Sequence, residues 1–86
     1  ESLQAAAVAE GFDEATSAKL VAQLLVGAAA LLEREPKHAR ELRQRVTSPN
    51  GTTAAGVAAL NDRKTHDAFV AAVRAATQRS KELGDA

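Results

Sequence analysis

The chain has 86 residues and no cysteine, so it is expected to form one small domain without disulfides or a thiolate metal site. Its 11 basic and 11 acidic residues cancel, and the basic side chains of residues 34–45 are interleaved with glutamates. This mixture argues against nucleic acid as a partner, because nucleic acid binding needs a patch of one sign. Alanine supplies more than half of the hydrophobic residues, so the core of a single copy should be thin.

Neither end of the chain resembles a secretory signal. The longest apolar run, residues 24–32, has about half of the roughly 20 residues that a bilayer-spanning helix needs. The chain starts at Glu1 and has no methionine, which suggests that it begins inside a larger protein. We therefore expect a cytoplasmic protein with no membrane partner.

Two helices are predicted in the first part of the chain. Residues 3–10 form a short helical segment that Gly11 ends, since glycine suits the left-handed position after a helix. Asp13 then offers an N-cap for a longer helix that runs to about Glu35, where Pro36 stops it.

The middle of this second helix is apolar on all sides. Residues 21–32 contain one polar side chain, Gln23, and such a helix must be surrounded by protein. Because a chain this short can hardly surround it, we expect burial against a second copy, with Gly27 and the alanines after it allowing close approach. The alternative is a central helix in a monomeric bundle.

Three further helices are predicted, and nothing alternates as a strand would. They cover residues 38–45, 52–60 and 65–83, with a polar connection at residues 61–64. The expected fold is therefore an all-α domain of about five helices, residues 1–86, in an intertwined homodimer. His38 and His66 are interpreted as structural residues, and no metal site is predicted.

The most informative segment, residues 46–57, places a Pro-Asn-Gly turn and two threonines directly before a helix. The first N–H groups of a helix lack partners and carry the positive end of its dipole, so they can bind a carboxylate or a phosphate. Asn50 and Gly51 both tolerate the positive φ that such a turn usually needs. The alternative is a plain helix start that Thr52 or Thr53 caps.

This segment resembles the Thr-Ser-Pro-Gly-Gly-Thr-Thr signature of the C-terminal domain of pyrroline-5-carboxylate reductase. Further stretches occur in the order of that family and cover nearly the whole chain: residues 6–12, 23–29, 38–42 and 71–82. The resemblance implies a helical domain that dimerises and holds the substrate. NADPH or NADH would be bound by a Rossmann domain that is absent from this chain, which has no dinucleotide fingerprint and no cofactor site of its own.

The resemblance also implies roles for five residues. The substrate carboxylate would lie on N–H groups around Asn50, Gly51 and Thr52, with Ser48 shaping or contacting the site. Thr53 would be the catalytic residue, with its hydroxyl near the ring nitrogen; orienting the substrate is its more plausible role, because a threonine is a poor acid.

The chain departs from the family pattern at two informative places. Asn50 stands where glycine is usual, and Arg63 and Lys64 stand where a glycine pair often occurs. Only Asn50 touches the implied site, where its side chain could narrow the pocket.

The leading interpretation is thus one domain of an NAD(P)H-dependent oxidoreductase of proline biosynthesis, inactive by itself. It would form a homodimer, with a larger assembly of dimers left open. The alternatives are a non-catalytic helical homodimerisation module and an anion-binding module.

Overall fold

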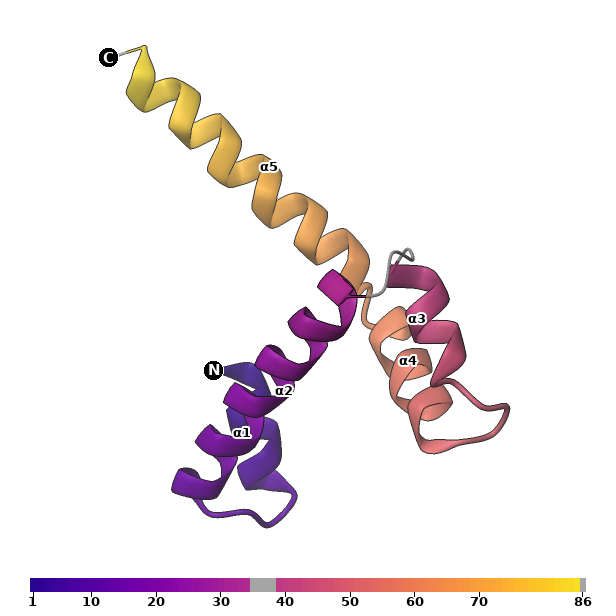
Figure 1. Cartoon of the computed structure of the whole chain (residues 1–86). Helices are drawn as coiled ribbons and strands as arrows, with labels where there is room; N and C mark the ends of the chain where they lie inside the picture. The colour runs from indigo at the N-terminus through magenta and orange to yellow at the C-terminus, as the bar shows by residue number, and fades with distance from the viewer. Residues whose placement is uncertain (35–38, 86) are drawn as a thin grey trace. The chain divides into compact units, whose positions relative to one another are not determined.

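The computed structural model describes residues 1–34 and 39–85, and these form five helices and no strand (Figure 1). The helices are α1 (Ser2–Ala9), α2 (Glu14–Arg34), α3 (Ala39–Arg45), α4 (Thr52–Asp62) and α5 (Thr65–Gly84). The all-α class is confirmed. The predictions made for Glu35, Pro36 and His38 lie outside the described residues.

The chain divides into two units, Glu1–Arg43 and Gln44–Ala86, and the boundary falls within α3. In the first unit α1 packs on α2, and in the second unit α4 and α5 contact each other near the turn that joins them.

The end of α1 has the hydrogen bonds of a Schellman motif, as the sequence predicts. Gly11 has a φ of 109°, in the left-handed region that favours glycine. The Phe12 N–H donates to the Ala7 carbonyl at 3.2 Å, and the Gly11 N–H donates to the Val8 carbonyl at 3.0 Å. Two carbonyls of the last turn are thereby satisfied.

The predicted N-cap of α2 is also confirmed. The Thr16 N–H donates to Asp13 Oδ1 at 2.7 Å, and the Ser17 N–H donates to the Asp13 carbonyl at 2.9 Å. The hydrogen bond from the Thr16 backbone favours the ionised carboxylate, so it lowers the pKa of Asp13. The negative charge also lies at the positive end of the α2 dipole.

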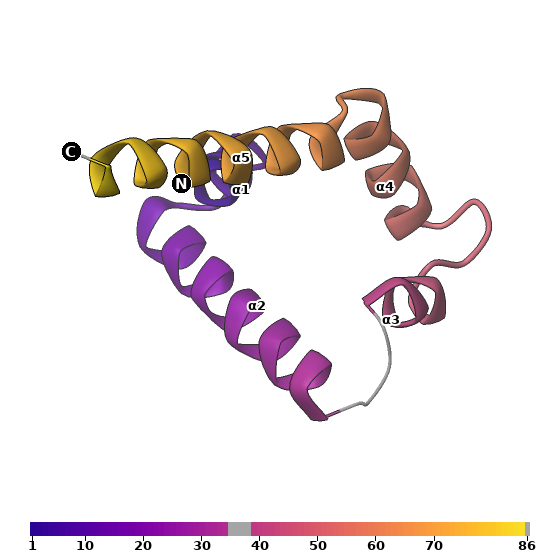
Figure 2. The ribbon, with the colours of Figure 1, turned by 90° about the horizontal axis from the view of Figure 1, so that it is seen from above.

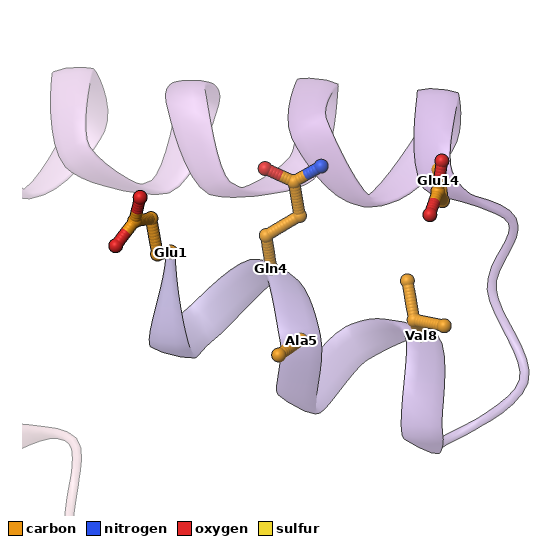
Figure 3. Close-up of a pocket in the computed structure, with 5 residues that line it drawn as sticks. All are labelled: Glu1, Gln4, Ala5, Val8 and Glu14. Atoms are coloured by element: carbon orange, nitrogen blue, oxygen red, sulfur yellow. The ribbon is translucent and has the colours of Figure 1, made fainter.

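α1 runs antiparallel to α2 and covers only its first part (Figure 3). Ser17 lies on the covered face and is fully buried, and its hydroxyl has no hydrogen-bond partner among the described residues. The part of α2 beyond α1 is exposed to solvent: Leu24 is 55% exposed and Val26 is 63% exposed. Among the described residues of its own unit, the short α1 therefore leaves the large apolar side chains in the second half of α2 exposed.

On length and composition alone, α2 is a helix that could cross a membrane. The expectation that no stretch is long enough to span a membrane is therefore wrong for α2, because it rested on uninterrupted apolar residues and this helix also includes Lys19 and Gln23. The core helix of a soluble protein passes the same test, so the observation is weak evidence for a membrane.

In the second unit, α5 extends away from α4 after their shared turn (Figures 1 and 2). Phe69 and Val73 on α5 are 69% and 66% exposed. α4 is two residues longer than predicted, since Asn61 and Asp62 continue the helix instead of opening a polar connection. The Arg63 N–H still donates to the Ala59 carbonyl at 3.1 Å, so two polar side chains did not end the helical hydrogen bonding.

No apolar side chain is buried within residues 1–34 and 39–85. The alanine content predicted a thin core, and the described residues of one copy form no buried apolar core at all. Helix caps and two helix pairs hold the local structure, while the large apolar side chains stay largely exposed.

The residue before α5 is in a costly conformation, which gives a test of the fold. Lys64 has a φ of 56°, whereas its neighbour Arg63 has a φ of −89°. We expect Lys64→Gly to stabilise the chain by about 1 kcal/mol, because the left-handed conformation strains a residue with a Cβ. Urea unfolding followed by circular dichroism measures the change.

Arg63→Gly is the matched control for Lys64→Gly. It adds the same flexibility to the unfolded chain but relieves no strain, so it should lower stability by about 0.5 to 1 kcal/mol. Equal effects of the two substitutions would contradict the strained conformation of Lys64.

Candidate functional site

The segment before α4 is a closed turn. The Gly51 N–H donates to the Ser48 carbonyl at 3.1 Å, and Asn50 has a φ of 60°. Pro49 at the second position and a positive φ at the third are the signature of a type II turn. Asparagine is among the few residues other than glycine that adopt this conformation readily, so Asn50 keeps the backbone that a glycine would give.

Gly51 is favoured by the limited space beside Ser48 and not by a special φ. Its φ is −86° and its ψ is 179°, which is extended backbone open to any residue. A Cβ added at Gly51 would lie 3.2 Å from the Ser48 carbonyl oxygen and 3.6 Å from the Ser48 Cβ. The prediction that either Asn50 or Gly51 takes a positive φ is thus resolved: Asn50 takes it, and Gly51 lets the turn close.

The start of α4 is capped by Gly51, whose carbonyl accepts the Ala55 N–H at 3.1 Å. Glycine has no side chain, so no side-chain oxygen at the N-cap serves the first turn of α4. Thr52 and Thr53 lie inside the helix and are exposed. The alternative interpretation, in which one of them is the N-cap, is wrong.

This geometry selects which N–H groups could bind an anion. The Gly51 N–H is already used by the Ser48 carbonyl. The N–H groups of Thr52 and Thr53 come too early in α4 to have a carbonyl four residues back within the helix. They carry the positive end of the helix dipole, and the side chains around them, including Ser48 and Asn50, are exposed.

The sequence analysis missed a hollow of about 400 Å³ on the other unit, between α1 and the start of α2 (Figure 3). It is lined by Glu1, Gln4, Ala5, Val8 and Glu14. The side chains of Gln4 and Val8 point from α1 toward α2 (Figure 3). The hollow is open to solvent beside the short helix α1. Its two carboxylates, those of Glu1 and Glu14, belong to no sequence motif that would have pointed to a site.

No group of three or more metal-ligating side chains occurs in the described part of the chain. The chemistry available at the turn is therefore that of backbone N–H groups and of the hydroxyls of Ser48, Thr52 and Thr53. Such groups bind and orient an anion, and they do not by themselves move a hydride.

Comparison with known proteins gives one consistent result. Residues 1–83 match the family model described as pyrroline-5-carboxylate reductase dimerisation. The chain is 42% identical over 84 residues to pyrroline-5-carboxylate reductase of Synechocystis, which covers 98% of this chain and 32% of that protein. It is 43% identical over 75 residues to pyrroline-5-carboxylate reductase 1 of Bacillus subtilis, covering 87% of this chain and 25% of that protein.

A vertebrate relative is similar to a comparable degree. Pyrroline-5-carboxylate reductase 3 of Rattus norvegicus is 40% identical over 83 residues, covering 96% of this chain and 30% of that protein. The chain thus spans about a third or less of the length of these relatives.

The closed turn predicts that one of two neighbouring substitutions destabilises the chain and that the other leaves the turn nearly unchanged. Gly51→Val should destabilise the chain by about 1 kcal/mol or more, because its Cβ would crowd the Ser48 carbonyl oxygen. It should also shift the backbone amide resonances of residues 48–54. Asn50→Gly keeps the positive φ and should leave these resonances nearly unchanged apart from residues 49–51. Wild-type stability of Gly51→Val would show that the turn is not closed in this way.

Proposed function

This chain belongs to the pyrroline-5-carboxylate reductase dimerisation family, and from that premise we propose that it is the dimerisation and substrate-binding domain of an enzyme that reduces 1-pyrroline-5-carboxylate to proline. The observation that carries the proposal is the family match over residues 1–83. The preorganised turn of residues 48–51 supports it, because it presents an exposed helix start to an anionic substrate.

In this proposal the substrate carboxylate lies on the first N–H groups of α4. Thr52 and Thr53 supply these N–H groups, whereas Gly51 keeps its own N–H within the turn and allows close approach. The Ser48 hydroxyl and the Asn50 amide flank the carboxylate. Asn50 narrows the site without changing the backbone, since it takes the conformation that glycine would take.

Thr53 orients the ring of the substrate. Its exposed hydroxyl belongs to the first turn of α4 and is a hydrogen-bond partner for the ring nitrogen while the carboxylate is held nearby. The imine reacts in its protonated form: hydride adds to the imine carbon, the C=N double bond becomes a single bond, and the nitrogen keeps the proton it already carries. Holding both groups in one geometry raises the rate by orientation and asks no acid strength of the threonine.

The hydride donor is a pyridine nucleotide, NADPH or NADH, held by a Rossmann domain in the remaining part of the enzyme. This chain supplies the substrate side, and residues 1–86 act together as one domain. The reductase activity therefore needs both parts.

A second copy of the chain covers the apolar surface that one copy leaves bare. This surface consists of the exposed apolar side chains of α2 beyond α1 and of Phe69 and Val73 on α5. A homodimer is the simplest cover, because two-fold symmetry places the same apolar patch on both partners. Lys19 and Gln23 within α2 favour a protein cover over lipid, since polar groups are costly in a bilayer.

The substrate site gives the first test of this function. Titrating the chain with proline should shift amide resonances centred on residues 50–53. Thr53→Val should weaken binding about fivefold, because it removes one hydrogen bond and nearly conserves volume. Thr77→Val on α5, the same substitution on another exposed threonine, should leave proline binding unchanged.

Two results would contradict the substrate site. One is a pair of equal effects from Thr53→Val and Thr77→Val. The other is a set of identical shifts with inorganic phosphate at lower concentration than with proline, which would favour a general anion-binding module.

The assembly gives a separate test. Sedimentation equilibrium of the chain at micromolar concentration, without detergent, should give twice the mass of 8.9 kDa for one copy. The expected dimer follows from the exposed apolar surface. A folded monomer, or partition of the chain into vesicles instead of a dimer, would overturn the assembly.

A further inference from the structure

Within the described part of the chain, no neighbouring atom explains why position 27 is a glycine. It lies inside α2, where glycine is less favourable than alanine, and alanine occupies the three positions after it. Its φ is not in the left-handed region, and a Cβ added to it would meet nothing within 4 Å. A helix-interior glycine with open space around it is unexplained by one copy of the chain.

The position of Gly27 gives it a specific neighbourhood. Leu20, Leu24, Gly27 and Leu31 follow one another at spacings of four, three and four residues, which places them on one stripe of α2. The three leucines are between 45% and 55% exposed. Gly27 therefore forms a gap in an exposed ridge of leucines.

We propose that α2 crosses α2 of a second copy at Gly27, so that the two glycines meet at the two-fold axis. The inference rests on the homodimer of the proposed function and adds its point of closest contact. Without a Cβ on either helix, the two backbones approach closely, and the leucines on each side of the gap close around the contact.

The second copy fits this stripe better than another partner does. Between Leu20 and Leu32 the helix carries no charge, so its occupant must be apolar over the same length. A second copy of α2 carries the same leucines and the same glycine. When Gly27 of one copy faces Gly27 of the other, the two surfaces are complementary by symmetry. The family match to a dimerisation domain covers this helix entirely.

Cross-linking tests the contact directly, because the chain contains no cysteine. The thiol of Gly27→Cys also takes up space at the crossing, so oxidation is carried out at a concentration at which sedimentation shows this variant to be a dimer. The two thiols would then face each other across the axis, within the Cα separation of about 7 Å that a disulfide spans. Val26→Cys is the matched control, one residue away and turned by about 100° around the helix. Mild oxidation should cross-link Gly27→Cys at least about tenfold faster, since fixed neighbours have a high effective concentration.

A second variant tests whether the two α2 backbones approach closely at Gly27. Gly27→Ala adds one methyl group per copy at the crossing and should weaken dimerisation about tenfold, although alanine favours the helix. Gly84→Ala makes the same change at the end of α5, where a Cβ also meets nothing within 4 Å, and should leave the dimer unchanged. Circular dichroism checks that Gly27→Ala keeps its helical content.

The outcomes separate this inference from the homodimer. A wild-type monomer would overturn both. A wild-type dimer in which Gly27→Cys cross-links no faster than Val26→Cys, or in which Gly27→Ala dimerises as well as wild type, would overturn the crossing at Gly27 alone.

Discussion

The structure depends on one constraint: the chain makes more apolar surface than it can cover. A helix that is apolar all round is stable only when its surface is covered, and α1 reaches only the first part of α2 (Figure 3). What one copy can do is satisfy its backbone. The Schellman motif at Gly11, the Asp13 cap and the turn before α4 are all local devices, and none needs a core. At these described helix ends the backbone hydrogen bonds are thus made within one copy, while the large apolar side chains stay exposed.

The features that the sequence predicted well are those set by neighbouring residues. Gly11 and Asp13 have side-chain chemistry that suits one position at a helix end, so both could be assigned from type and spacing alone. The start of α2 was predicted from Asp13, and the two ends of α5 were predicted to within one residue from its hydrophobic spacing. The resemblance carried by residues 46–57 then led to the family, which the match over residues 1–83 confirmed.

The features that were missed depend on geometry that residue types leave open. Asn61 and Asp62 are residues typical of a loop, yet the helical hydrogen bonds of α4 continue through them. Asn50 and Gly51 were equivalent candidates for a positive φ, and only the closed turn assigned it to Asn50 and showed that Gly51 is limited by the Ser48 carbonyl. The buried Ser17 was not predicted either, because its burial comes from the angle at which α1 meets α2. The site residues themselves stay a prediction.

The link between α1 and α2 has a consequence for how the molecule assembles in time. Only four residues separate the two helices. The end of α1 and the start of α2 are each fixed by hydrogen bonds between residues close in the sequence. Contacts this local form fast, on the microsecond scale typical of helices and short loops. Meeting a second copy is a bimolecular event, and its rate rises with concentration. In the proposed homodimer the helices therefore form quickly and the encounter of two copies is the slow step, so the time for which the apolar side chains stay exposed is set by the protein concentration.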